Sequence, residues 1–155
     1  MSASPEAGSM TRSFDDNGSP IVEIEVSGPV NDPRKMTAMV DTGFSGFLLL
    51  PILEAFPVGL ILSGTTSVEL ADGTKQNKLT CLGQIHYGGT KKVGLIIIEW
   101  ENTDILVGMD FLRKFEKTLV VDPVNGKVIL FDSSIFSKPA RENPAPPSSE
   151  PPTTA

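Results

Sequence analysis

The sequence of 155 residues has few of the side chains that bind metals or form disulfides. It contains one cysteine, Cys81, and one histidine, His86. A single cysteine excludes an internal disulfide and fits a reducing compartment. The two residues lie five positions apart in a predicted strand, so their side chains point to opposite faces and do not form a nucleophile pair. Because no further Cys or His completes a ligand set, we expect no bound metal and no cofactor.

Positive charge and long apolar runs are also scarce. Thirteen Lys and Arg residues stand against nineteen Asp and Glu, which gives a net charge of −6. An acidic chain with scattered basic residues argues against a nucleic-acid-binding surface. No apolar run approaches the roughly 18 residues that a membrane-spanning helix needs, and residues 1–17 lack the apolar core of a signal peptide. We therefore expect a protein that binds neither nucleic acid nor a membrane and that resides in the cytoplasm.

The composition changes at both ends of the chain. Residues 1–19 are small, polar and rich in Gly, Ser and Asp, which predicts a disordered segment. Residues 137–155 contain six prolines, and this density predicts an extended, disordered tail. Residues 20–136 remain, and they are enough for one folded domain with its own core.

This central region has mainly the two-residue periodicity of β-strands. In residues 21–26 every second residue is apolar, and in residues 35–41 the apolar face lies opposite Asp41. Residues 95–98 are apolar throughout, which predicts a central strand. A short amphipathic helix is predicted at residues 109–115. Further strands are predicted at residues 47–50, 65–70, 75 onward, 79–87, 91–98, 104–107, 118–122 and 127–131.

An acidic turn lies between two apolar runs. Residues 40–45 read Val-Asp-Thr-Gly-Phe-Ser. Asp is depleted in strands and is costly to bury unpaired, so Asp41 needs a local role in the turn or a chemical one. Gly43 permits a tight turn whose backbone N–H groups point back at the carboxylate, and Thr42 and Ser45 add hydroxyl groups. These residues alone leave two interpretations open: a plain hairpin turn that begins with Asp, or a carboxylate held for catalysis.

Three segments, in this order along the chain, resemble those of the single-domain, retropepsin-like aspartic proteases. Residues 40–45 are similar to the family's active-site turn, and residues 105–112 (Ile-Leu-Val-Gly-Met-Asp-Phe-Leu) to its second signature. Between them, residues 70–73 (Leu-Ala-Asp-Gly) stand where the family has the tip of its flap hairpin, and Asp-Gly is a strong hairpin signal in its own right. The resemblance covers roughly residues 20–132.

The resemblance implies a fold and an activity. The implied fold is all-β: a small closed β-barrel or sandwich with one short C-terminal helix, assembled as a homodimer. The implied activity is that of an aspartic-type endopeptidase, a hydrolase that acts on a peptide or protein substrate. Retroviral members commonly have Arg after the glycine of the second signature, where it ties the dimer by an ion pair. Here that residue is Met109, so dimer stability has to come from other contacts.

The resemblance also implies roles for individual residues. Asp41 is the implied catalytic carboxylate. The Thr42 hydroxyl is expected to bond the partner's backbone, Gly43 to bring its N–H near the carboxylates, and Ser45 to bond an outer carboxylate oxygen. Two further groups complete the expected site: Leu106, Val107 and Gly108 beneath the turn, and Leu70, Ala71, Asp72 and Gly73 in a mobile flap that closes over substrate.

Carboxylate-based peptide hydrolysis needs a pair of acids that share one proton, one acting as base on a water and the other polarising the scissile carbonyl. The chain has one Asp-Thr-Gly, and no internal repeat supplies another. A two-fold homodimer places the same residue on both sides of its axis. We therefore expect two Asp41 carboxylates, one from each chain, to activate the water, and the monomer to be inactive.

The same residues allow three other interpretations. The main alternative is a non-catalytic dimerisation or peptide-binding module with the same fold, although retention of Asp41, Thr42, Gly43 and Ser45 together speaks against it. An unrelated β-barrel binding protein would leave the second signature without explanation. A metal hydrolase lacks a plausible ligand set.

Overall fold

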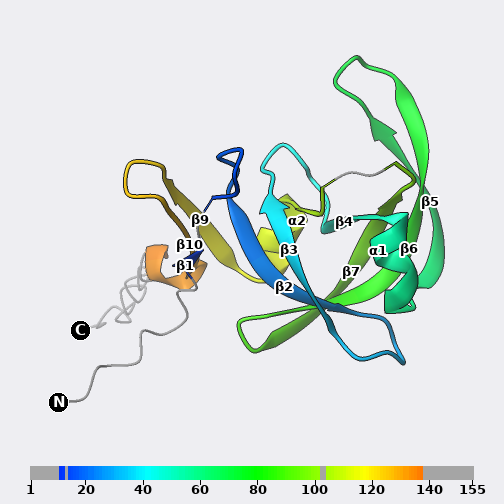
Figure 1. The fold of residues 1–155 in the computed structure, drawn as a ribbon, viewed down its shortest axis with the longest axis horizontal. Helices are drawn as coiled ribbons and strands as arrows, with labels where there is room; N and C mark the ends of the chain where they lie inside the picture. The colour runs from blue at the N-terminus through cyan, green and yellow to red at the C-terminus, as the bar shows by residue number, and fades with distance from the viewer. Residues whose placement is uncertain (1–10, 13, 102–103, 138–155) are drawn as a thin grey trace, which may run out of the picture.

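The computed structural model describes residues 11–12, 14–101 and 104–137 (Figure 1). These residues form mostly β-structure, as the sequence predicts. The strands are β1 (Thr11–Arg12), β2 (Ile21–Ser27), β3 (Arg34–Val40), β4 (Leu48–Pro51), β5 (Ile61–Glu69), β6 (Lys75–Tyr87), β7 (Thr90–Glu99), β8 (Leu106–Val107), β9 (Lys117–Asp122) and β10 (Lys127–Asp132). The helices are α1 (Ile52–Ala55) and α2 (Met109–Lys114), with 3-10 turns at Phe56–Val58 and Ser133–Phe136.

Six strands close into a barrel. Their order is β2-β3-β8-β4-β7-β6. Strand β6 also pairs with β2, the first strand of this order, and this pairing completes the ring. Closure leaves these strands without a long open edge. The closed β-barrel with one short helix near its C-terminal end, α2, confirms the predicted fold class. No helix in the described ranges has the length and apolar character needed to cross a bilayer.

The barrel interior follows the predicted alternation. Met36, Ala38 and Val40 of β3 are buried, which leaves Asp41 to begin the opposite face. Strand β7 lies between β4 and β6, so it is central as predicted. It still alternates, because Ile96 and Ile98 are buried while Leu95 is half exposed on the outside of the barrel.

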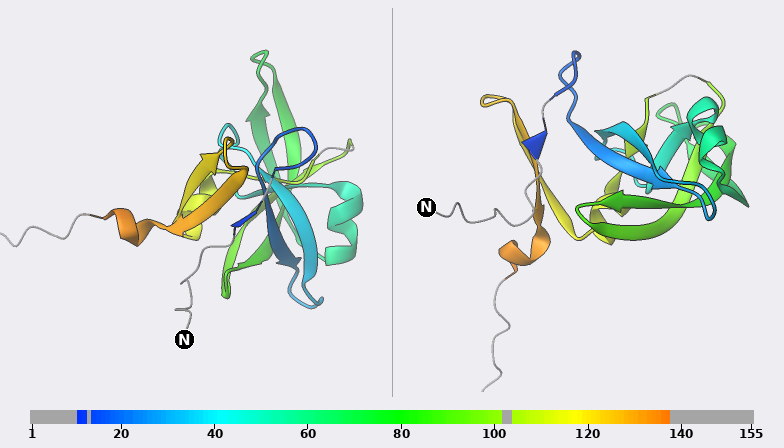
Figure 2. Two further views of the ribbon diagram at one scale, coloured as in Figure 1. Left: turned by 60° about the vertical axis from the view of Figure 1, so that its left-hand side comes forward. Right: turned by 60° about the horizontal axis from the view of Figure 1, so that its bottom comes forward.

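The C-terminal hairpin lies in a second, smaller sheet. Strand β10 pairs with β9 on one side and with β1 on the other, in the register Thr11↔Ile129 and Arg12↔Val128. Figure 2 shows this three-stranded sheet standing beside the barrel. Helix α2 links the two parts, with Phe111 fully buried in the core and Leu112 and Phe115 nearly so.

The N-terminal segment differs from the prediction for residues 1–19. Residues 11–12 are a strand, and residues 14–20 form a turn closed by a bridge between Phe14 and Pro20. Inside it, Asp15 Oδ1 accepts hydrogen bonds from the backbone N–H groups of Asn17 (2.9 Å) and Ser19 (2.8 Å). Polar residues can order a turn through such bonds without burying apolar surface, which a composition rule does not register. Residues 1–10 and most of the proline-rich tail, from residue 138, lie outside the described residues.

Candidate active site

Asp41 follows directly after β3, at a point where the backbone is held from two sides. Its N–H donates to the carbonyl oxygen of Val107 (3.0 Å), and the N–H of Val40 donates to that of Pro20 (2.8 Å). Val40 and Val107 are partners in the parallel β3–β8 ladder. The position of the Asp41 backbone is therefore set by the barrel itself, while its side chain is partly exposed.

The turn after Asp41 folds back onto the carboxylate. The Gly43 N–H donates to Asp41 Oδ1 (2.8 Å), and the Phe44 N–H donates to the Asp41 carbonyl oxygen (3.1 Å). A side chain at position 43 would begin 3.1 Å from Oδ1, so glycine gives the carboxylate room. Within the described residues, the exposed hydroxyl groups of Thr42 and Ser45 make no hydrogen bond to Asp41.

The second signature lies against this turn. Strand β8 is inserted between β3 and β4, with Leu106 opposite Met39 and the fully buried Val107 opposite Val40. Beyond it, Gly108 is so close that an added Cβ would lie 2.2 Å from the carbonyl oxygen of Phe44.

Hydrogen bonds from two backbone N–H groups extend this contact into α2. The N–H of Met109 donates to the Phe44 carbonyl oxygen (2.8 Å), and the N–H of Asp110 is shared between those of Ser45 and Gly46 (3.2 Å each). The first turn of α2 therefore braces the loop that carries Asp41. Leu106, Val107 and Gly108, singled out from the sequence, lie together with residues 41–46.

Residues 70–73 form the tip of the β5–β6 hairpin. The hairpin extends beyond the barrel, on the side from which the β3–β4 turn also projects (Figure 1). Its tip is closed by Leu70 N–H to Thr74 O (2.8 Å) and Gly73 N–H to Leu70 O (2.9 Å). Gly73 has φ +82°, the left-handed conformation for which glycine is favoured. Hydrogen bonds from the Thr74 hydroxyl (2.7 Å) and backbone N–H (2.9 Å) hold the pKa of Asp72 below its ordinary value.

A hollow of about 580 Å³ opens beside the Asp41 turn. It begins at Thr42 and runs along α2 towards β9. Apolar side chains contribute to it, including Met109, which is 41% exposed. The lining residues are Thr42, Met109, Leu112, Arg113, Glu116, Lys117, Thr118, Leu119 and Ser133. The surface next to Asp41 is thus hollowed rather than closed within one chain.

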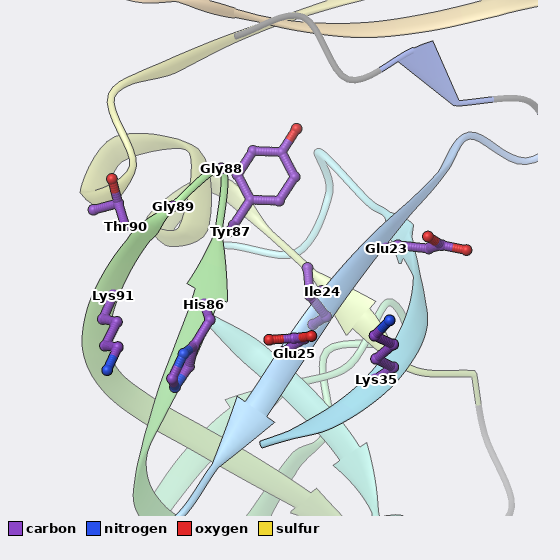
Figure 3. A pocket seen from close by; sticks show the side chains of 10 residues that line it. All are labelled: Glu23, Ile24, Glu25, Lys35, His86, Tyr87, Gly88, Gly89, Thr90 and Lys91. Carbon is purple, nitrogen blue, oxygen red and sulfur yellow. The ribbon is translucent and has the colours of Figure 1, made fainter. Parts of the chain in front are cut away.

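A second hollow, of about 370 Å³, contains none of the predicted site residues (Figure 3). On the outside of the barrel, Lys35, Glu25, His86 and Lys91 lie in a row across four strands, as the strand register requires. The Nε2 atom of His86 lies 2.9 Å from Ser27 Oγ. The single histidine is therefore engaged in the β2–β6 contact, away from Asp41. Across the described ranges, no group of three or more His, Cys, Asp or Glu residues is arranged to hold a metal.

Comparison with solved structures identifies the architecture: the chain has a retropepsin-like fold. The crystal structure of a retropepsin-like aspartic protease from Rickettsia conorii matches with a TM-score of 0.57 and 20% identity, over 84% of this chain and 95% of that one. EIAV protease complexed with the inhibitor HBY-793 matches with a TM-score of 0.56 and 12% identity, over 71% of this chain and all of that one. No protein-family profile matches this sequence, and no curated protein is similar to it in sequence.

Proposed function

We propose that the chain is an aspartic-type endopeptidase that works as a homodimer. One observation supports this most: the Asp41 carboxylate emerges from a buried strand into a glycine turn, with the turn braced by residues 108–110. A plain surface turn does not need a second segment of chain, far away in sequence, to hold it in place. One matched structure is a retropepsin-like aspartic protease and the other a protease bound to an inhibitor, and the fold shared with them agrees with the proposal.

The proposed chemistry joins two copies of the chain. A two-fold axis beside Asp41 brings the two carboxylates together, and like charges about 3 Å apart cannot both ionise. The pair then holds one proton. The ionised carboxylate takes a proton from a water, which attacks the peptide carbonyl, while the protonated one donates to the carbonyl oxygen. The titration belongs to the pair and not to either residue.

The remaining site residues have supporting roles in this proposal. Gly43 already donates its N–H to Asp41 Oδ1. The exposed hydroxyl of Thr42 is free to bond the partner's turn, and that of Ser45 to bond an outer carboxylate oxygen once the dimer has formed. Residues 70–73 form a flap that closes over an extended peptide and excludes water from the carboxylates. Residues 20–136 form the proposed catalytic domain.

The test is cleavage of a peptide mixture, read by mass spectrometry, with Asp41→Asn compared with wild type. Because Asn keeps the shape but neither accepts nor donates the catalytic proton, we expect cleavage to fall by roughly 10²- to 10⁴-fold. Asp32→Asn, the same change at an exposed turn position, is the matched control and should cleave normally. Sedimentation should show the same dimer for all three proteins. Retained cleavage by Asp41→Asn, or loss of wild-type cleavage in EDTA, would rule out this mechanism.

A further inference from the structure

We propose that an ion pair between Lys78 and Glu99 sets the position of the β5–β6 hairpin, and through it the closure of the flap. Lys78 Nζ lies 2.7 Å from Glu99 Oε1. The two side chains are only 14% and 15% exposed, so the pair is largely withdrawn from water. The inference rests on the proposed function only in assigning the hairpin to substrate binding.

The pair lies where the hairpin leaves the barrel. Strands β6 and β7 are paired from Tyr87↔Thr90 up to Leu79↔Ile98, and there the ladder ends. Lys78 and Glu99 are the next residue on each strand. From Lys78 back to Lys75, β6 pairs only with β5, in the register Thr66↔Lys78 to Glu69↔Lys75. The ion pair thus joins the barrel and the projecting hairpin at the point where the β6–β7 ladder ends.

Little else fixes the projecting part of the hairpin. Residues 69–77 are all exposed, so this part of the hairpin buries little side-chain surface. A two-stranded ribbon without a packed face is marginally stable in water. The orientation of the hairpin relative to the barrel therefore depends on the contacts at its base. A short ion pair at the base affects this orientation more than contacts nearer the tip do.

Glu99 also holds the chain that leaves β7. The same oxygen, Oε1, accepts a hydrogen bond from the Trp100 backbone N–H (3.2 Å). One carboxylate oxygen thus joins the base of the hairpin to the end of β7. Removing either partner of such a pair leaves a charge in a poorly hydrated place, which is more disruptive than losing an exposed ion pair.

The test uses amide hydrogen exchange, which does not depend on catalysis. In Lys78→Met, which keeps the length of the chain but not the charge, we expect residues 66–76 to exchange about 10-fold faster or more. The amides of β2 inside the barrel should accelerate much less. Lys75→Met is the matched control: Lys75 is on the same strand, exposed, and has no ion pair within the described residues. It should leave exchange unchanged.

Two further variants separate positioning from general stability. Lys78→Arg can still reach Glu99, and should restore slow exchange. The exchanged pair, Lys78→Glu with Glu99→Lys, should recover at least part of it. Equal acceleration of hairpin and barrel amides in Lys78→Met would make the pair purely structural, and no acceleration at all would show that it does not hold the hairpin. Either result would overturn the proposal.

If the wild type cleaves peptides, Lys78→Met should raise KM more than it lowers kcat, because substrate must then order a looser flap. A KM equal to that of wild type would count against the positioning role. If the wild type cleaves nothing, the proposed function fails, while the exchange data still decide whether the pair holds the hairpin.

Discussion

Replacing Gly108 with alanine inserts one methyl group between α2 and the turn that carries Asp41. The added Cβ would lie 2.2 Å from the Phe44 carbonyl oxygen and 2.6 Å from that of Gly46. Both are backbone atoms, so no side-chain rotation relieves the contact. The backbone at Gly108 has φ −122° and ψ −159°, which any residue can adopt. The effect of the substitution is therefore steric, and the turn and α2 have to move apart.

The expected cost has two parts. Forcing an extra methyl group into a packed site costs about 1–3 kcal/mol. Separation also weakens the hydrogen bonds from the Met109 and Asp110 N–H groups to the turn, each worth about 1 kcal/mol. We expect Gly108→Ala to lower the free energy of unfolding by about 2–4 kcal/mol. Since the movement also displaces Asp41, and about 1 Å of misplacement can cost 10²-fold in rate, cleavage should fall as well.

The assay is urea unfolding at one fixed protein concentration, because the stability of the proposed dimer would depend on concentration. Gly89→Ala is the matched control. Nothing lies within 4 Å of an added Cβ there, but φ is +77°, so the cost is backbone strain alone, about 1–2 kcal/mol. If Gly108→Ala costs no more than Gly89→Ala and cleaves peptides at the wild-type rate, the tight brace under the Asp41 turn does not exist in solution.

Two further predictions concern titrating groups outside the Asp41 turn. The buried Tyr87 hydroxyl has no hydrogen-bond partner within the described residues, and burial, with Asp132 nearby, raises its pKa. Stability should therefore fall as the pH rises beyond about 10, where the unfolded chain ionises first, and Tyr87→Phe should abolish this loss without lowering stability at pH 7, as urea unfolding can show. The pKa of Asp72 is held low by Thr74, so its stabilising effect is present at neutral pH and is lost as the pH falls through the lowered pKa. Thr74→Val, without the hydroxyl donor, should raise that pKa in an NMR titration, and an unchanged value would contradict the bond.

Sequence reasoning succeeded where local pattern and long-range structure agree. Strands β2 and β3 alternate along a closed barrel, and their buried faces could be read from the order of residues. The hairpin at Asp72-Gly73 follows from the φ values that such turns require. Placing residues 106–108 near Asp41 needed more than periodicity, because β8 has only two residues. That expectation rests on the resemblance to the retropepsin-like aspartic proteases and not on the pattern of any one strand.

The features that sequence reasoning missed are pairings between distant or unremarkable residues. Strand β1 is two polar residues long, and it is a strand because it pairs with the edge of β10. No local sequence pattern predicts this pairing. Lys78 and Glu99 are 21 positions apart, and each reads as an ordinary surface charge. Only the register that stops β7 at Glu99, while β6 continues, brings them together. Both contacts are set by which strands pair and in which register, and a local sequence pattern does not specify this.

The two parts of the proposed site, the Asp41 turn and the β5–β6 hairpin, are not held equally firmly. This difference suits their proposed roles. The Asp41 turn is fixed by backbone hydrogen bonds from β8 and α2, and Gly43 donates to the carboxylate itself. Catalysis by a shared proton requires that precision, since the second carboxylate has to meet the first at hydrogen-bond distance. The hairpin, in contrast, is exposed along its outer part and is linked to the barrel by side chains at its base. A rigid flap would block entry of a peptide, and an unanchored one would not return to the same place. In the proposed enzyme, a firmly held carboxylate and a hairpin held at its base would satisfy both requirements.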